Sequence, residues 1–137
     1  MCLAVFIASD HPLPERAWSE ESSGLGVTPL PERDAPVRGQ FTRAHVYSVR
    51  AHSGCGCGFS PEQEWNETAR RDSVTALVAY LTDVGRTGPV DLFVCWSDAA
   101  DLEAEPKRRL RLAPAELGER SDWTAELTFV EIRSPAP

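Results

Sequence analysis

Two cysteines separated by a single residue lie near the middle of the chain, in the sequence Gly54-Cys55-Gly56-Cys57-Gly58. Glycine before, between and after them permits positive φ angles and lets both sulfurs turn toward one point. Two converging thiols can chelate a soft metal ion or form a reactive redox pair. The spacing therefore indicates a metal or thiol site, with a tight glycine-cysteine corner as the purely structural alternative.

A metal centre needs more ligands than this pair supplies, and three further residues are candidates: Cys95, His52 and Cys2. Zinc is commonly held by thiolate or imidazole ligands in a tetrahedral arrangement, and Cu(I) also accepts thiolates. Paired zinc cysteines usually have two to four residues between them, whereas this pair has one. The sequence therefore predicts zinc or copper without deciding between them. For Cys95 and Cys2, a role as small buried hydrophobes is the alternative.

Three predicted elements surround the cysteine turn. Apolar runs predict strands over 41–51 and 90–96, and an apolar face at helical spacing predicts a helix over 61–84 between them. Ser60 and Gln63 have the types and spacing of a capping box, which places the helix start beside the turn. The positive end of the helix dipole would then stabilise a thiolate in the turn.

A strand-helix-strand run of this kind usually has a right-handed crossover, which makes its two strands parallel. The cysteine turn and Cys95 would then leave the sheet at the same edge, with His52 beside them. Another buried strand is predicted over 2–8. Cys2 joins the group only if that strand runs antiparallel to the other two.

The whole chain, 1–137, is predicted to form a single α+β domain of two layers, in which one main helix (61–84) packs across a mixed β-sheet of four to five strands. Further strands are expected over 107–112 and 123–133, with a short one near 25–28 and a helical turn over 114–117. Residues 10–40 are rich in proline and lack periodicity, so they are expected to cross the surface as a lid or a strap.

Composition and charge exclude several classes of function. The net charge of −7 argues against binding to a nucleic-acid backbone. The apolar opening, 1–8, has no basic region and is too short to span a bilayer, so no membrane partner is expected. We therefore expect a cytoplasmic protein with reduced thiols. Neither a GxGxxG nor a Walker motif occurs, so no nucleotide cofactor is expected. A homodimer and a protein or small-molecule partner stay open.

Three functions are compatible with these features. The first is metal binding through the C-x-C turn, and the second is thiol-disulfide redox chemistry with Cys55 and Cys57 as the pair. The third is a non-catalytic interaction domain in which the turn is only a backbone corner. Whether the protein is an enzyme stays open, and Cys2 would become an N-terminal nucleophile if Met1 were removed.

The opening MCLAVFIAS and the motif GCGCGF together resemble a group of small uncharacterised bacterial proteins that carry both features. One motif opens the chain and the other lies near its middle, so the resemblance spans most of the sequence. No activity is attached to this group, and the resemblance therefore implies no functional residue.

Overall fold

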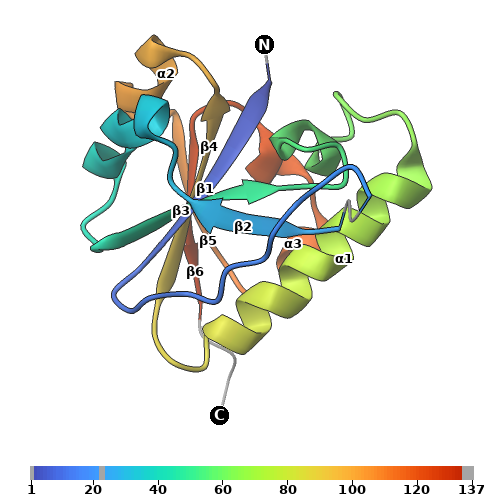
Figure 1. The fold of residues 1–137 in the computed structure, drawn as a ribbon, viewed down its shortest axis with the longest axis horizontal. Coiled ribbons are helices and arrows are strands. Elements are labelled where there is room, and N and C mark those ends of the chain that lie inside the picture. The colour runs from blue at the N-terminus through green and yellow to red at the C-terminus, as the bar shows by residue number, and fades with distance from the viewer. Residues whose placement is uncertain (1, 22–23, 134–137) are drawn as a thin grey trace.

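Figure 1 shows the computed structural model of the chain, which describes residues 2–21 and 24–133. In these ranges six strands form one mixed sheet, where four to five strands were expected, and the α+β class is confirmed. The strands are Leu3–Ser9 (β1), Gly26–Pro29 (β2), His45–Arg50 (β3), Val90–Trp96 (β4), Arg108–Leu112 (β5) and Thr128–Ile132 (β6). Their order across the sheet is β2-β3-β1-β4-β6-β5.

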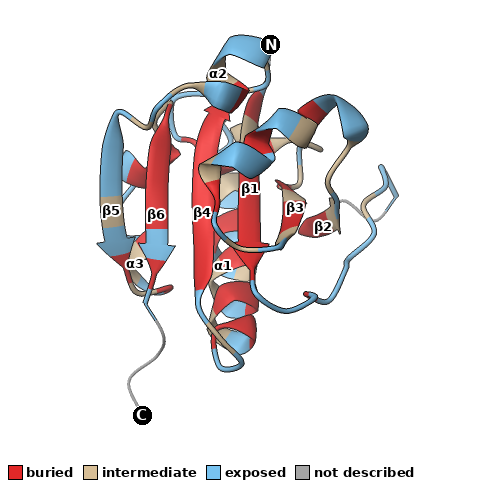
Figure 2. Ribbon diagram, turned by 90° about the vertical axis from the view of Figure 1, so that its left-hand side faces the viewer, coloured by how far each residue is buried: buried red, intermediate tan, exposed pale blue. Residues whose placement is uncertain are grey.

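β1 lies at the centre of the sheet and pairs antiparallel with β3 on one side and β4 on the other. β3 and β4 therefore run in the same direction, as predicted from the crossover between them, but β1 separates them. β1 and β4 are apolar along most of their length because both of their faces are buried, as Figure 2 shows. The parallel pair of the sheet is β5 with β6, at the edge.

The long helix α1, Glu67–Val84, covers one face of the sheet. Its buried Leu77 and Leu81 belong to the same apolar core as Val5 and Ile7, which project from β1 toward the helix. Because successive strand residues point to opposite faces, this core uses only every second residue of β1. The remaining residues of β1 need a second cover.

The opposite face is covered by a 3-10 helix, η1 (Glu32–Gln40), and a short helix, α2 (Ala99–Glu103). Val37 of η1 and Leu102 of α2 pack there in a second core that contains Phe93 of β4. The predicted two-layer arrangement is therefore wrong, since the sheet is covered on both faces. The error arose because the segments that form η1 and α2 have no apolar periodicity long enough to predict a helix.

The helix start predicted at residues 60–63 is also wrong. α1 begins at Glu67, and Asn66 is its N-cap, with the side-chain oxygen accepting a hydrogen bond from the Ala69 amide (3.1 Å). Ser60 instead closes a separate turn, in which the Glu64 amide donates to its carbonyl (2.9 Å). Both residues are of a capping type, so local preference alone could not choose between them.

The described residues of the 10–40 segment are tied to the body of the protein by hydrogen bonds. The Leu13 amide donates to the Tyr47 hydroxyl (2.9 Å), and the Tyr80 hydroxyl donates to the Pro14 carbonyl (2.7 Å). Arg16 pairs with Val27 through two backbone hydrogen bonds. The short strand expected near 25–28 is present as β2, whereas the 3-10 helix η1 was not predicted.

The C-terminal third differs in detail from the predicted elements. The strand expected over 123–133 is shorter, because Trp123 lies in a 3-10 turn and Leu127 has a positive φ of 57° before β6. The Trp123 indole is buried and donates to the Leu117 carbonyl (3.0 Å). The remaining elements are η2 (Gly56–Phe59), α3 (Glu116–Glu119) and η3 (Asp122–Thr124).

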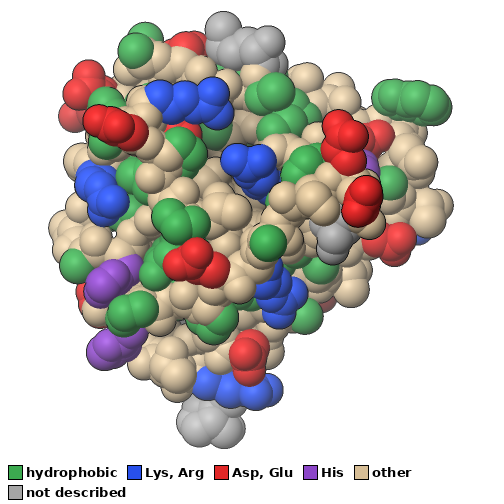
Figure 3. Space-filling view, viewed as in Figure 1, with side chains coloured by type: hydrophobic (Ala, Val, Ile, Leu, Met, Phe, Trp, Pro, Cys, Tyr) green, Lys and Arg blue, Asp and Glu red, His purple; other side chains and the backbone are tan. Residues whose placement is uncertain are grey.

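Acidic and basic side chains are interspersed over the face of the molecule drawn in Figure 3. In the described ranges, none of the helices combines the length and the apolar character needed to cross a membrane.

Candidate metal centre

Three thiols meet at one end of the central strand. Cys2 immediately precedes β1, and Cys55 and Cys57 lie in the turn that follows β3. The three sulfur atoms all lie within 4.8 Å of one another, and Cys2 is exposed whereas the other two are partly buried. The condition set for Cys2 is met, because β1 runs antiparallel to both β3 and β4. Its amino end therefore lies where β3 ends, and the group is close enough to hold a metal ion.

Glycine is required in the turn for two different reasons. Gly54 has a positive φ of 88°, and a Cβ there would lie 3.1 Å from the Trp18 ring. Gly56 lies so close to β1 that a Cβ would come within 2.8 Å of the Leu3 carbonyl and 2.9 Å of a Val5 methyl group. The predicted positive φ is thus confirmed at Gly54 only, and Gly56 serves a close approach of two backbone segments.

Backbone hydrogen bonds fix the turn to the strand beside it. The Ala51 amide donates to the Cys55 carbonyl (3.0 Å), and the Gly54 amide donates to the Ala51 carbonyl (3.0 Å). The Leu3 amide, which is the first of β1, donates to the Cys57 sulfur (3.1 Å). This last bond joins residues 54 positions apart and places one thiol directly over the amino end of β1.

Cys55 ionises most readily of the three thiols. Burial disfavours its charged form, but hydrogen bonds from the Cys57 amide and from the thiols of Cys57 and Cys2 outweigh burial and lower the pKa of Cys55. The predicted stabilisation by the start of the long helix is wrong, because α1 begins only at Glu67. A backbone amide and neighbouring hydrogen-bond donors supply the stabilisation instead.

The other two thiols hold their protons more strongly. Burial raises the pKa of Cys57 to about 11, which the hydrogen bond from the Leu3 amide offsets only in part. The pKa of Cys2 is raised mainly by its hydrogen bond to Cys55 and by the charge that Cys55 carries. The cluster therefore favours one thiolate held by two thiols, which is the expected state of close thiols without a cation.

Cys95 does not join the cluster. It is fully buried in the core on the opposite face of the sheet, near Phe93, whereas Cys57 packs against the core beneath α1. Burial, together with the nearby Asp101, raises the pKa of Cys95 to about 12. The prediction that Cys95 is a ligand is wrong because Cys95 reaches the right edge of the sheet but points to the wrong face.

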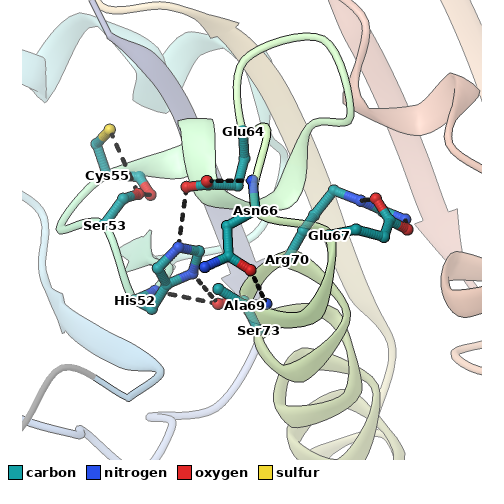
Figure 4. A network of polar contacts seen from close by, with 9 residues as sticks. All are labelled: His52, Ser53, Cys55, Glu64, Asn66, Glu67, Ala69, Arg70 and Ser73. Atoms are coloured by element: carbon teal, nitrogen blue, oxygen red, sulfur yellow. Dashed lines mark hydrogen bonds and ion pairs between the residues drawn. The ribbon is translucent and has the colours of Figure 1, made fainter.

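His52 is not a member of the thiol group either, because both of its ring nitrogens have other partners. Nδ1 lies 2.6 Å from the Ser73 hydroxyl and Nε2 lies 2.9 Å from the Glu64 carboxylate, as Figure 4 shows. The His52 amide also donates to the Ser73 hydroxyl (3.1 Å). A hydrogen bond from the Asn66 amide, and another from His52, lower the pKa of Glu64. His52 therefore ties the cysteine turn to α1.

A cavity of about 390 Å³ borders the cluster on the side of η1. Cys2 and Cys55 form one part of its wall, and Arg33, Asp34 and Arg50 contribute charged groups. Sequence reasoning missed these three residues, because Arg33 and Asp34 lie in the segment without periodicity. Only their position in the fold brings them to the cysteines.

No family model, curated protein or solved structure matches the chain.

Replacing Gly56 with alanine is expected to lower the free energy of unfolding by about 1–3 kcal/mol, since the new methyl group must displace the β1 backbone or the turn. Urea denaturation of the reduced protein measures this loss. Gly39→Ala is the matched control, because a Cβ at Gly39 has no atom within 4 Å. Equal losses in the two variants would contradict the close approach.

Cys55 is expected to react with iodoacetamide ahead of the more exposed Cys2, because its pKa is lowered and that of Cys2 is raised. Cys95 is expected to stay unmodified until the protein unfolds. Mass spectrometry of peptides after timed alkylation between about pH 6 and 9 measures the order. Faster modification of Cys2 across this range would show that solvent access, and not the pKa of the thiol, decides the order of reaction.

Proposed function

We propose that this protein binds one soft metal ion through Cys2, Cys55 and Cys57. The observation that carries the proposal is the convergence of three sulfurs within 4.8 Å from segments far apart in the sequence. Bond lengths of about 2.3 Å in a tetrahedral zinc site place sulfurs about 3.8 Å apart. The cluster therefore needs to contract by about 1 Å at most, which rotation of partly buried side chains can supply.

The donor set favours zinc, with Cu(I) as the alternative. Thiolates are the ligands that both ions prefer, and zinc is commonly held by three protein ligands when a fourth position is left for water or another molecule. The cavity of about 390 Å³ beside Cys2 and Cys55 gives such a molecule a place. A site with three protein ligands and an adjacent cavity is therefore typical of a centre that binds a further group.

The surroundings of the sulfurs also suit a negatively charged metal-thiolate unit. Three thiolates with Zn²⁺ carry one excess negative charge, and with Cu⁺ they carry two. The Leu3 amide donates to the Cys57 sulfur (3.1 Å), and the Cys57 amide interacts with the Cys55 sulfur. Such hydrogen bonds to ligating sulfurs disperse negative charge and fix ligand orientation.

Thiol-disulfide exchange is a second candidate, and the lowered pKa of Cys55 favours it. The Cys55 thiolate would attack a substrate disulfide, releasing one substrate thiol and forming a mixed disulfide. Attack by Cys57 on Cys55 would then release the second substrate thiol and leave a Cys55–Cys57 disulfide. The protein would become lighter by two hydrogen atoms, a product that metal binding does not give.

Protein purified anaerobically is expected to carry one zinc or copper ion per chain, lost in Cys55→Ser and in Cys2→Ser. Native mass spectrometry with elemental analysis measures this. Because the pKa values of Cys2 and Cys57 are raised, both thiols release a proton on binding. The affinity for zinc should therefore rise with pH between about 6 and 8, by up to about tenfold per unit for each proton released.

Cys95→Ala is the matched control, since Cys95 lies in the opposite core and its loss should leave the metal content unchanged. Metal-free wild-type protein that does not take up zinc or Cu(I) would overturn the proposal. Metal-free protein that accumulates a Cys55–Cys57 disulfide would move the function to thiol exchange.

A further inference from the structure

The cavity beside the thiols is lined by Asp34, whose carboxylate accepts no hydrogen bond from any described residue. Asp34 lies in η1, and only 9% of its side chain is exposed. Its one cationic neighbour in the described part of the chain is Arg33, at 3.7 Å, whose own side chain is 79% exposed. Removing a charge from water is costly unless it is paired and hydrogen-bonded. The Asp34 carboxylate is therefore suited to a cationic donor that enters the cavity.

Arg50 also lines this cavity. It is the last residue of β3 and is half-buried, and no ion pair or hydrogen bond joins its side chain to a described residue. An arginine fork presents several donors in one plane and matches a carboxylate well. No ion pair joins Arg50 and Asp34, so a positive and a negative residue both border the cavity without pairing with each other.

We propose that this cavity binds a small zwitterion of the amino-acid class, with its carboxylate on Arg50 and its ammonium group on Asp34. The rest of the ligand would then lie against Cys2 and Cys55, which form another part of the wall. A volume of about 390 Å³ lies in the range of small-molecule sites and accommodates an amino acid or a dipeptide.

This inference does not depend on the metal. It rests on Asp34 and Arg50, neither of which belongs to the thiol cluster, and a ligand held there would sit next to the open position of a bound ion. An amino acid and a dipeptide share the two charged groups and differ in the distance between them. The separation of Arg50 and Asp34 decides which of the two binds.

The test titrates the reduced full-length protein, as purified and after chelation, with L-alanine and with L-alanyl-L-alanine by isothermal calorimetry. Saturable binding of one of them is expected in both preparations. Asp34→Asn should weaken binding by about tenfold or more but leave the weak affinity for the N-acetylated ligand unchanged, because that ligand has no ammonium group. Arg50→Gln should likewise weaken binding of the unblocked ligand by about tenfold or more. It should leave the weak affinity for the methyl ester unchanged, because that ligand has no carboxylate.

Arg38→Gln is the matched control, since Arg38 lies in η1 but does not border this cavity. A variant that merely disturbs the fold would weaken the parent and the blocked ligands equally, and this result would overturn the proposal. Absence of binding of both probes to the wild-type protein would also overturn it. Ligand binding by a protein that takes up no metal would support the ligand site and contradict the metal centre. Metal uptake without ligand binding would support the metal centre and contradict the ligand site.

Discussion

β1 pairs antiparallel with β3 and with β4, and the thiol cluster depends on this arrangement. The amino end of β1 therefore lies at the edge of the sheet where β3 ends and the cysteine turn begins. The turn can then approach β1 only because residue 56 has no side chain, and the Leu3 amide can reach the Cys57 sulfur. A parallel β1 would leave Cys2 at the opposite edge, with a two-sulfur site.

The close packing of the thiols determines their chemistry. Each sulfur lies in the field of the others, so that one proton is lost easily and the next two are lost with difficulty. A bound cation relieves this mutual repulsion because its positive charge offsets part of the three thiolate charges. A single attacking thiolate avoids this repulsion, because its two neighbours remain uncharged thiols. The metal and redox candidates are thus two outcomes of one electrostatic arrangement.

Much of this architecture could be predicted from the sequence. The cysteine pair, the central apolar strands and the condition on Cys2 all followed from residue types and spacing. The start of α1 could not be predicted, because Ser60 and Asn66 are both good caps. His52 contacts Glu64, which lies between the two caps, and Ser73 of α1, and local sequence preference contains no information on these contacts.

The metal ligands were harder to predict from the sequence than the fold. Strand periodicity shows that Cys95 alternates with its neighbours, but it does not reveal which face the cysteine turn will cover. His52 lies close to Cys55 in sequence, yet its ring turns to partners on the helix side. Asp34 and Arg50 could not be recognised as parts of one site from the sequence, because only the packing of η1 beside β3 brings them to the same cavity.

X-ray absorption spectroscopy of the zinc-loaded protein counts the sulfur atoms that bind the metal. We expect three sulfur neighbours at about 2.3 Å with one lighter atom, and two sulfur neighbours in Cys2→Ser. The spectrum of Cys95→Ala should be unchanged. A first shell without sulfur, or a fourth sulfur that disappears in Cys95→Ala, would contradict a site built from Cys2, Cys55 and Cys57.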